Sequence, residues 1–396
     1  WISWGDNDFA ENVVHLVLAR LPDAPAGSRG ISLFLVPKFV PDAGGAPGRR
    51  NELQVVSLDH KVGLHGSPTC VMAYEGATGW MIGEPNKGLA CMFTMMNNAR
   101  LGVSTEGIGV AEAAFQHALA FARDREQGRT PPIAEGERSI LGHADVRRML
   151  TAMKAQTQAA RALAYDCALH LDLARAAPSE SARAEAAAMG AFLTPIAKAF
   201  GTDTGNEVAH MGVEVHGGSG CIEETGAAQF SRDVRVTAIY EGTNGIQAMD
   251  LVGRKLADGG ATARAFLARV EETAAALATA AELPRDPDGL GALGLQTFGA
   301  QLREAAEVAR AATDWMLAAE SHDRGAGAAA YLRMLALIAG GRYHGRAALS
   351  SGERRRRELA RFWGEHFLPE AGALAQKATR GAKVLYALSA DDLAAA

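Results

Sequence analysis

The sequence predicts an α+β protein in which an antiparallel β domain is followed by a four-helix bundle and an additional helical domain. Three observations support this prediction. Residues 1–80 contain short apolar runs separated by stretches rich in Pro, Gly and Asp. Beyond residue 88 the apolar residues recur at helical spacing. A segment rich in Pro, Asp and Gly, residues 283–291, then divides the helical part. The predicted boundaries are 1–82, 83–281 and 290–396.

Four runs of apolar and β-branched residues are predicted to be strands, at residues 13–19, 30–37, 53–58 and 68–74. Because no helical pattern separates these runs, they favour an antiparallel sheet or a barrel-like arrangement. The segments between them contain the residues that turns require, and residues 41–48 in particular are predicted to form a loop.

The helical part begins with two long apolar stripes at helical spacing, one from Leu101 to Ala122 and one from Val146 to Leu171. An Ala-rich segment, residues 181–200, continues the pattern, and Pro195 predicts a kink in it. A fourth helix is predicted from about Ile246 to Ala281, and long helices with apolar stripes form bundles. In the last hundred residues, Gly340-Gly341 is predicted to separate two further helices.

Composition excludes several classes of protein. The 396 residues carry a net charge of −5, which offers no electrostatic footprint for nucleic acid. The four cysteines show no Cys-x-x-Cys pair, which argues against a zinc site or a disulfide framework and favours a reducing, cytoplasmic environment. Because the sequence has no uninterrupted apolar 20-mer, we expect no membrane span. The chain starts at Trp1 rather than Met, so we expect it to be a fragment.

Two glycine-rich segments are the strongest indications of function. One reads His-Gly-Gly-Ser-Gly from His216, and the other reads Tyr-Glu-Gly-Thr-Asn-Gly-Ile-Gln from Tyr240. Glycine lets the backbone approach a flat or phosphorylated ligand closely. Glu241, directly before the second glycine turn, is a candidate base. Taken alone, the octapeptide fits a solvated loop glutamate equally well.

Together with three further motifs, these segments resemble the acyl-CoA dehydrogenases, a family of flavoproteins. The further motifs begin at Trp1 (Trp-Ile-Ser-Trp-Gly), at Lys61 (Lys-Val-Gly-Leu-His-Gly-Ser-Pro-Thr) and at Arg123 (Arg-Asp-Arg-Glu-Gln-Gly-Arg). The resemblance covers residues 1 to about 260 in the family's order. The remaining residues resemble the C-terminal helical domain of a longer subgroup that includes 3-methylmercaptopropionyl-CoA dehydrogenases. In the family, a helical domain precedes the position of Trp1.

The resemblance implies FAD as cofactor and an acyl-CoA thioester as substrate, which is oxidised to the trans-2-enoyl-CoA. Glu241 would remove the α proton while hydride passes from the β carbon to flavin N5. The resemblance also implies an electron-transferring flavoprotein as partner and a homo-oligomer, either a dimer or a tetramer.

The same resemblance assigns the remaining site residues. Trp1 and Ser3 are implied to contact the flavin. Thr243, Asn244 and Gly245 are implied to contact the flavin of their own subunit. Those implied to reach the flavin of a neighbouring subunit are Arg125, Gln127, Glu214, Gly217 and Gly218, with Glu214 standing where the family more often has glutamine. Those implied to contact the substrate are Asn97, Arg100, Tyr240, Glu241 and Gly242.

Alternatives remain open for the residues and for the whole protein. Trp1 also fits an ordinary buried strand aromatic, Arg125 a surface ion pair, and Asn97 an exposed helical residue. Gly217 and Gly218 also fit a simple helix stop. An acyl-CoA oxidase would use the same base and cofactor, and a non-catalytic acyl-CoA dehydrogenase-like module would share the fold.

Overall fold

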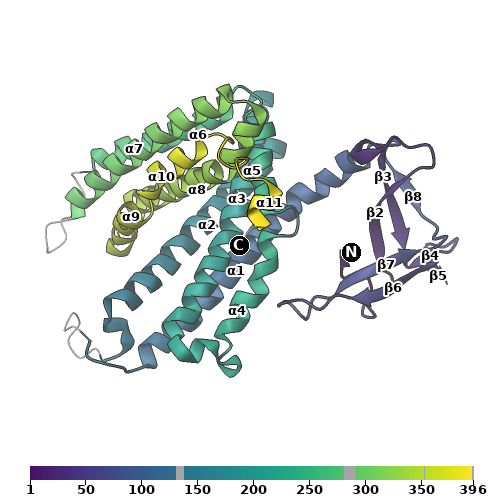
Figure 1. The fold of residues 1–396 in the computed structure, drawn as a ribbon, viewed down its shortest axis with the longest axis horizontal. Helices are drawn as coiled ribbons and strands as arrows, with labels where there is room; N and C mark the ends of the chain where they lie inside the picture. The colour runs from purple at the N-terminus through teal and green to yellow at the C-terminus, as the bar shows by residue number, and fades with distance from the viewer. Residues whose placement is uncertain (131–137, 281–290, 352, 395–396) are drawn as a thin grey trace. The chain divides into compact units, whose positions relative to one another are not determined.

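The computed structural model describes residues 1–130, 138–280, 291–351 and 353–394 (Figure 1). The chain divides into two compact units, Trp1–Ala99 and Arg100–Ala396. The first unit contains all the strands that the described residues form, and the second is helical.

The strands of the first unit pair only in antiparallel fashion within the described residues, as predicted. They form three small sheets, with orders β1-β7-β6, β2-β3-β8 and β4-β5. Each predicted strand lies within one residue of an observed one. The strands are β1 (Ile2–Ser3), β2 (Val14–Arg20), β3 (Ile31–Pro37), β4 (Phe39–Pro41), β5 (Pro47–Arg50), β6 (Leu53–Leu58), β7 (Thr69–Tyr74) and β8 (Trp80–Ile82), with a 3₁₀ turn η1 (Gly27–Gly30) before β3.

The predicted loop at residues 41–48 is correct at its centre and wrong at its ends, because β4 and β5 form a hairpin there. Asp42 Oδ1 accepts hydrogen bonds from the backbone N–H groups of Gly44 and Ala46, at 2.8 and 3.0 Å. An Asp side chain that accepts from the backbone just after it is typical of turns, as the Pro, Gly and Asp content of this segment predicts. The flanking strand β5 is entirely exposed and contains no large apolar residue, so it carries no strand pattern.

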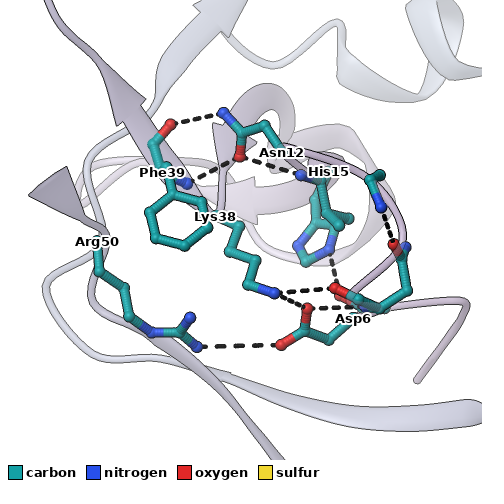
Figure 2. Close-up of polar contacts among 10 residues, drawn as sticks. Asp6, Asn12, His15, Lys38, Phe39 and Arg50 are labelled. Carbon is teal, nitrogen blue, oxygen red and sulfur yellow. Dashed lines mark hydrogen bonds and ion pairs between the residues drawn. The ribbon is translucent and has the colours of Figure 1, made fainter. Parts of the chain in front are cut away.

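Polar side chains tie the segment after β1 to Lys38, which follows β3, and to β4 (Figure 2). Lys38 Nζ donates to Asp6 Oδ1 at 2.5 Å and to the Asn7 carbonyl oxygen at 3.0 Å. Asn12 pairs with the backbone of Phe39 through both ends of its amide, at 2.8 and 2.9 Å. These bonds hold the loop between β1 and β2, which follows the predicted flavin contacts Trp1 and Ser3.

The helical unit starts with three long helices, and α2 and α3 pack directly against each other (Figure 1). The predicted stripes lie on their buried faces, as Ile108, Phe115 and Met153 illustrate. The helix that contains Pro195 continues through it to His216. The helices are α1 (Gly88–Asp124), α2 (Ala144–Ala176), α3 (Glu180–His216), α4 (Ala227–Asp233) and α5 (Asn244–Asp250), with 3₁₀ turns η2 (Ile140–Gly142), η3 (Gly217–Cys221), η4 (Glu223–Thr225) and η5 (Val234–Ala238).

The prediction of one helix from Ile246 to Ala281 is wrong. α5 ends at Asp250, a π-helical turn η6 (Leu251–Lys255) follows, and α6 (Ala261–Ala278) starts after a sharp turn. Gly259 and Gly260 have positive φ angles of 72° and 77°, which glycine adopts without strain. Asp258 accepts from the backbone N–H of Gly260 at 2.8 Å and of Thr262 at 2.9 Å, and so begins the new helix.

The prediction that Gly340-Gly341 separates two helices is also wrong, because α8 runs through both residues. A Cβ atom at Gly340 would lie 2.3 Å from the indole of Trp363, which is fully buried and donates its Nε1–H to the Leu337 carbonyl oxygen at 3.0 Å. The glycine therefore permits close helix packing. The C-terminal helices are α7 (Gly291–Ala318), α8 (Ser321–Ser351), α9 (Arg354–His366), α10 (Glu370–Ala378) and α11 (Ala390–Ala394).

One hydrophobic core extends through the predicted bundle and the predicted additional domain. It joins Phe192 and Phe266 to Phe298, Tyr331 and Trp363. Of the predicted linker at residues 283–291, residues 283–290 lie outside the described residues, and Gly291 begins α7. Among the helices of the described ranges, none combines the length and apolar character needed to cross a membrane.

Replacing Gly340 by Ala is expected to lower the free energy of unfolding by about 1–3 kcal/mol, because the added methyl group overpacks the contact with Trp363. Gly372 in α10 is the matched control, since a Cβ there meets no described atom within 4 Å. Gly372→Ala should stabilise the protein by about 0.4–1 kcal/mol. Denaturant unfolding of both variants checks the prediction. Equal stabilities would contradict the packing role of Gly340.

Candidate functional site

Glu241 has a backbone conformation that few non-glycine residues adopt. Its φ angle is 54°, and Gly242 follows with φ at 87°. The φ angle of Gly242 favours glycine, and a Cβ atom there would also lie 2.9 Å from the Gln247 side-chain nitrogen. The Glu241 side chain is partly buried. A strained residue of this kind persists only where its surroundings hold it, and such residues cluster at functional sites.

The residues on either side of Glu241 hold this turn. The Thr243 hydroxyl caps α5 by accepting from the Ile246 backbone N–H at 3.2 Å. The buried Gln247 amide donates to the carbonyl oxygens of Gly242 at 3.1 Å and of Glu241 at 3.4 Å. The Tyr240 hydroxyl donates to the Glu106 carboxylate of α1. Burial, together with that neighbouring carboxylate, raises the pKa of Tyr240 above its usual value.

Asn244, the first residue of α5, is bound to α3 through its side chain. Lys198 Nζ donates to Asn244 Oδ1 at 3.0 Å, and Asn244 Nδ2 donates to Asp203 Oδ1 at 2.7 Å. The Thr202 hydroxyl lies between them, 3.0 Å from Asn244 Nδ2. These bonds occupy the side-chain amide of Asn244 and direct it toward α3. A ligand at this turn would therefore contact the backbone of Asn244.

Arg100 of α1 reaches the same region from the other side. Its guanidinium donates to Asp250 of α5 at 3.2 Å, and the two side chains are only 3% and 2% exposed. Arg254 pairs with the other oxygen of Asp250 at 2.6 Å. Arg100 Nη2 also lies 3.8 Å from the position that a Cβ would take at Gly242. The turn after Glu241 is therefore held by side chains from α1, α3 and α5.

A second set of predicted residues meets where α1 and α3 end. Arg125 and Gln127 follow α1 and are exposed. Gly217, with φ at 58°, ends α3 and donates its N–H to the Glu214 carbonyl oxygen, so the helix-stop interpretation is correct as local structure. A Cβ at Gly217 or Gly218 would meet no described atom within 4 Å.

Aromatic stacking joins the two helix ends. The His216 ring stacks on Phe121 of α1 with a centroid separation of 4.3 Å and on His117 at 4.8 Å. This brings the Arg125 and Gly217 segments together, although nearly one hundred residues separate them in sequence. Along α1 and α3, the set lies roughly 30 Å from the Glu241 turn, at 1.5 Å per helical residue.

Three of the predicted residues, Trp1, Ser3 and Asn97, belong to the first unit. The Trp1 side chain is 88% exposed, so the alternative of a buried strand aromatic is wrong in this structure. Ser3 and Asn97 are also exposed.

The sequence interpretation missed residues that hold the Glu241 turn, among them Lys198, Asp203, Gln247 and Asp250. Two of them carried a usable signal. Lys198 is the one charged residue in the largely apolar stretch from Phe192 to Phe200, and Asp250 precedes the buried residues Leu251 and Val252. A charge inside an apolar helical run is rarely buried without a partner, so it predicts a buried pair.

Two family models match the chain. Residues 86–257 match the model described as acyl-CoA dehydrogenase, C-terminal domain. Residues 266–389 match the model described as acetyl-CoA dehydrogenase C-terminal like. The first match ends before α6 and the second begins inside it, although α6 packs into a core that both matched segments share.

Similar proteins support the same assignment. A 3-methylmercaptopropionyl-CoA dehydrogenase of Ruegeria pomeroyi is 47% identical over 358 residues, which cover 89% of this chain and 58% of that protein. The chain thus spans little more than half the length of this relative. The structure of Caenorhabditis elegans ACDH-11 in complex with C11-CoA is 25% identical with a TM-score of 0.73, covering 95% of this chain and 61% of that one.

An acyl-CoA dehydrogenase from Bacillus anthracis, whose structure is described as complexed with FAD, shares the fold at 19% identity and a TM-score of 0.64, covering 96% of this chain and 62% of that one. The chain therefore belongs to the acyl-CoA dehydrogenase family, in the branch that carries an additional C-terminal helical domain.

Proposed function

We propose that the protein containing this chain oxidises an acyl-CoA thioester to the trans-2-enoyl-CoA, with Glu241 as the base that removes the α proton. The observation that carries this proposal is the strained conformation of Glu241. Side chains from three helices hold its turn, and a solvated loop glutamate would need no such support.

The chemistry requires a carboxylate within reach of the α carbon and hydrogen-bond donors directed at the thioester oxygen. Glu241 can supply both, because its side chain accepts the proton while its backbone N–H donates to the oxygen. FAD, when bound, supplies the acceptor for the hydride that leaves the β carbon. Tyr240 and Gly242 keep the base in place, and buried Arg100 supports the turn through its ion pair with Asp250.

The exposed residues fit the cofactor that the family implies. The Arg125 guanidinium has the forked geometry that binds phosphate oxygens, and Gln127 adds amide donors beside it. The open backbone at Gly217 and Gly218 allows close approach of a flat group, since no side chain covers it. Trp1 offers an exposed ring face and Ser3 a hydroxyl.

Two sets of cofactor residues on one helical unit support a homo-oligomer. The set at Arg125 and Gly217 lies roughly 30 Å from the Glu241 turn, measured along the helices. We therefore assign it to the cofactor of a neighbouring subunit, and assign Thr243, Gly245 and the Asn244 backbone to the cofactor beside the base. An electron-transferring flavoprotein is the proposed electron acceptor.

The substrate class follows from the same argument. The Ruegeria pomeroyi relative is named for a methylmercaptopropionyl thioester, and the Caenorhabditis elegans structure is described with C11-CoA. Both ligands are acyl-CoA thioesters, which is the class we propose for this protein.

Mixing the complete FAD-containing protein anaerobically with a panel of acyl-CoA thioesters tests the proposal. At least one saturated thioester is expected to bleach the flavin absorbance and to yield the enoyl-CoA. Adding oxygen during turnover distinguishes the two enzyme types, since an oxidase would release stoichiometric hydrogen peroxide and a dehydrogenase would not. A panel of short, medium and long thioesters that leaves the flavin oxidised would overturn the proposal.

A further inference from the structure

Lys198 is one of several charged side chains that are buried in the helical unit. It lies in the middle of α3 with no exposed surface. A buried ammonium group is costly unless a partner stabilises its charge. Its ammonium group donates a hydrogen bond to Asn244 Oδ1 at 3.0 Å. The charge is therefore directed at the residue that begins α5, three positions after Glu241.

We propose that Lys198 is a positioning residue for the reaction, because its ammonium group holds Asn244 and so fixes the turn that carries Glu241. This inference rests on the proposed function. The link is short and rigid: Asn244 is clamped between Lys198, Thr202 and Asp203 of one helix, and Thr243 before it caps α5. Loss of the ammonium releases one side of this clamp.

The charges around Lys198 come from three elements. Asp203 lies on α3, Arg100 on α1 and Glu241 in the turn before α5. Farther out, Arg333 of α8 and Glu207 of α3 act on Asp203. Burial lowers the pKa of Lys198 to about 8, helped by Arg100 and opposed by the Asp203 and Glu241 carboxylates. The ammonium is thus charged below about pH 8 and neutral above it.

Loss of the Lys198 charge should lower the activity as the pH rises. Below about pH 8 the charged ammonium donates a strong bond to Asn244 and faces the Glu241 carboxylate. As the pH rises through that value, the charge is lost and the turn loosens. Tyr240 does not titrate in this range, because its pKa is raised above its usual value. Activity should therefore decline above about pH 8.

Three variants of the complete FAD-containing protein test this. Lys198→Met removes the charge and the donor, and is expected to lower kcat/KM about 10²-fold, the effect of a misplaced catalytic group. Lys198→Arg keeps a permanent charge, so the decline of kcat/KM above about pH 8 should disappear. Thr204→Val is the matched control, since Thr204 is equally buried on α3 and its hydroxyl has no partner among the described residues. It should leave the pH profile unchanged.

Hydrogen exchange of the Ile246 and Gln247 amides gives a readout that needs no turnover. Both amides donate to Thr243, at 3.2 and 3.0 Å. Lys198→Met should speed their exchange at least about tenfold, because a bond to a charged group is lost. Thr204→Val should not. If Lys198→Met does not fold, the wild-type protein and Lys198→Arg still test the proposal. The exchange protection of these two amides should fall above about pH 8 in the wild-type protein and should not fall in Lys198→Arg.

The outcomes separate the two proposals. If the wild-type protein turns over acyl-CoA but Lys198→Met keeps its rate and its amide protection, Lys198 has no positioning role and the proposed function stands. If no thioester reacts while Lys198→Met still loosens the turn, the proposed function fails, and with it the link from Lys198 to catalysis.

Discussion

Glu241→Gln should lower the rate of flavin reduction by an acyl-CoA substrate by about 10³–10⁴-fold, the upper part of the range for general base catalysis. The substitution keeps the shape of the side chain and removes its ability to accept a proton. The backbone of residue 241 is unchanged, so its strained turn and its bonds to Gln247 should persist. Stopped-flow bleaching of the FAD-containing protein measures the rate directly.

Glu185→Gln is the control for the charge change, because Glu185 is exposed near the start of α3, far along that helix from Lys198. It should bleach at the wild-type rate. Both variants should show the wild-type flavin spectrum, which demonstrates that the cofactor remains bound. A Glu241→Gln protein that retains more than about one tenth of the wild-type rate would show that Glu241 is not the base, since a general base raises the rate at least about 10²-fold.

Asp250→Ala should lower the free energy of unfolding by about 3–5 kcal/mol, because it leaves the Arg100 guanidinium in a buried position without its carboxylate. The loss should also reach the Glu241 turn, since Arg100 lies beside Gly242. Denaturant unfolding gives the stability, and flavin reduction gives the effect on the site.

An exposed ion pair provides the comparison. Asp314 pairs with Arg264 at 2.7 Å, and the two side chains are 57% and 42% exposed. Asp314→Ala should therefore cost less than about 1 kcal/mol. The double variant Arg100→Met with Asp250→Leu removes both charges and should be more stable than Asp250→Ala alone, because no buried charge is left unpaired. If Asp250→Ala and Asp314→Ala were equally stable, the buried pair would not hold the turn.

The elements that the sequence predicted well are those whose signal is local. The strand at residues 53–58 and the stripes in α1 and α2 repeat with the period of their own backbone, so each can be recognised from a short window. The Asp42 turn is likewise local. The failures have long-range causes. Gly340 lies inside a helix, where its lack of a side chain leaves room for Trp363, more than twenty residues away.

The candidate site divides in the same way. The octapeptide around Glu241 marks the proposed base and its glycine turn, since both lie within eight consecutive residues. No local pattern connects Lys198 to Asn244, or Arg100 to Asp250, because these partners are 46 and 150 residues apart.

The order of residues along this chain was sufficient to establish its family, its strand and helix content and the acid at position 241. Only packing in three dimensions decided that α1, α3 and α5 converge on that acid, that Asn244 turns inward toward α3, and that the last helices share one core with the bundle. The physical reason is that motifs and periodicity report on neighbours along the backbone, whereas burial brings together charges that no window of sequence contains.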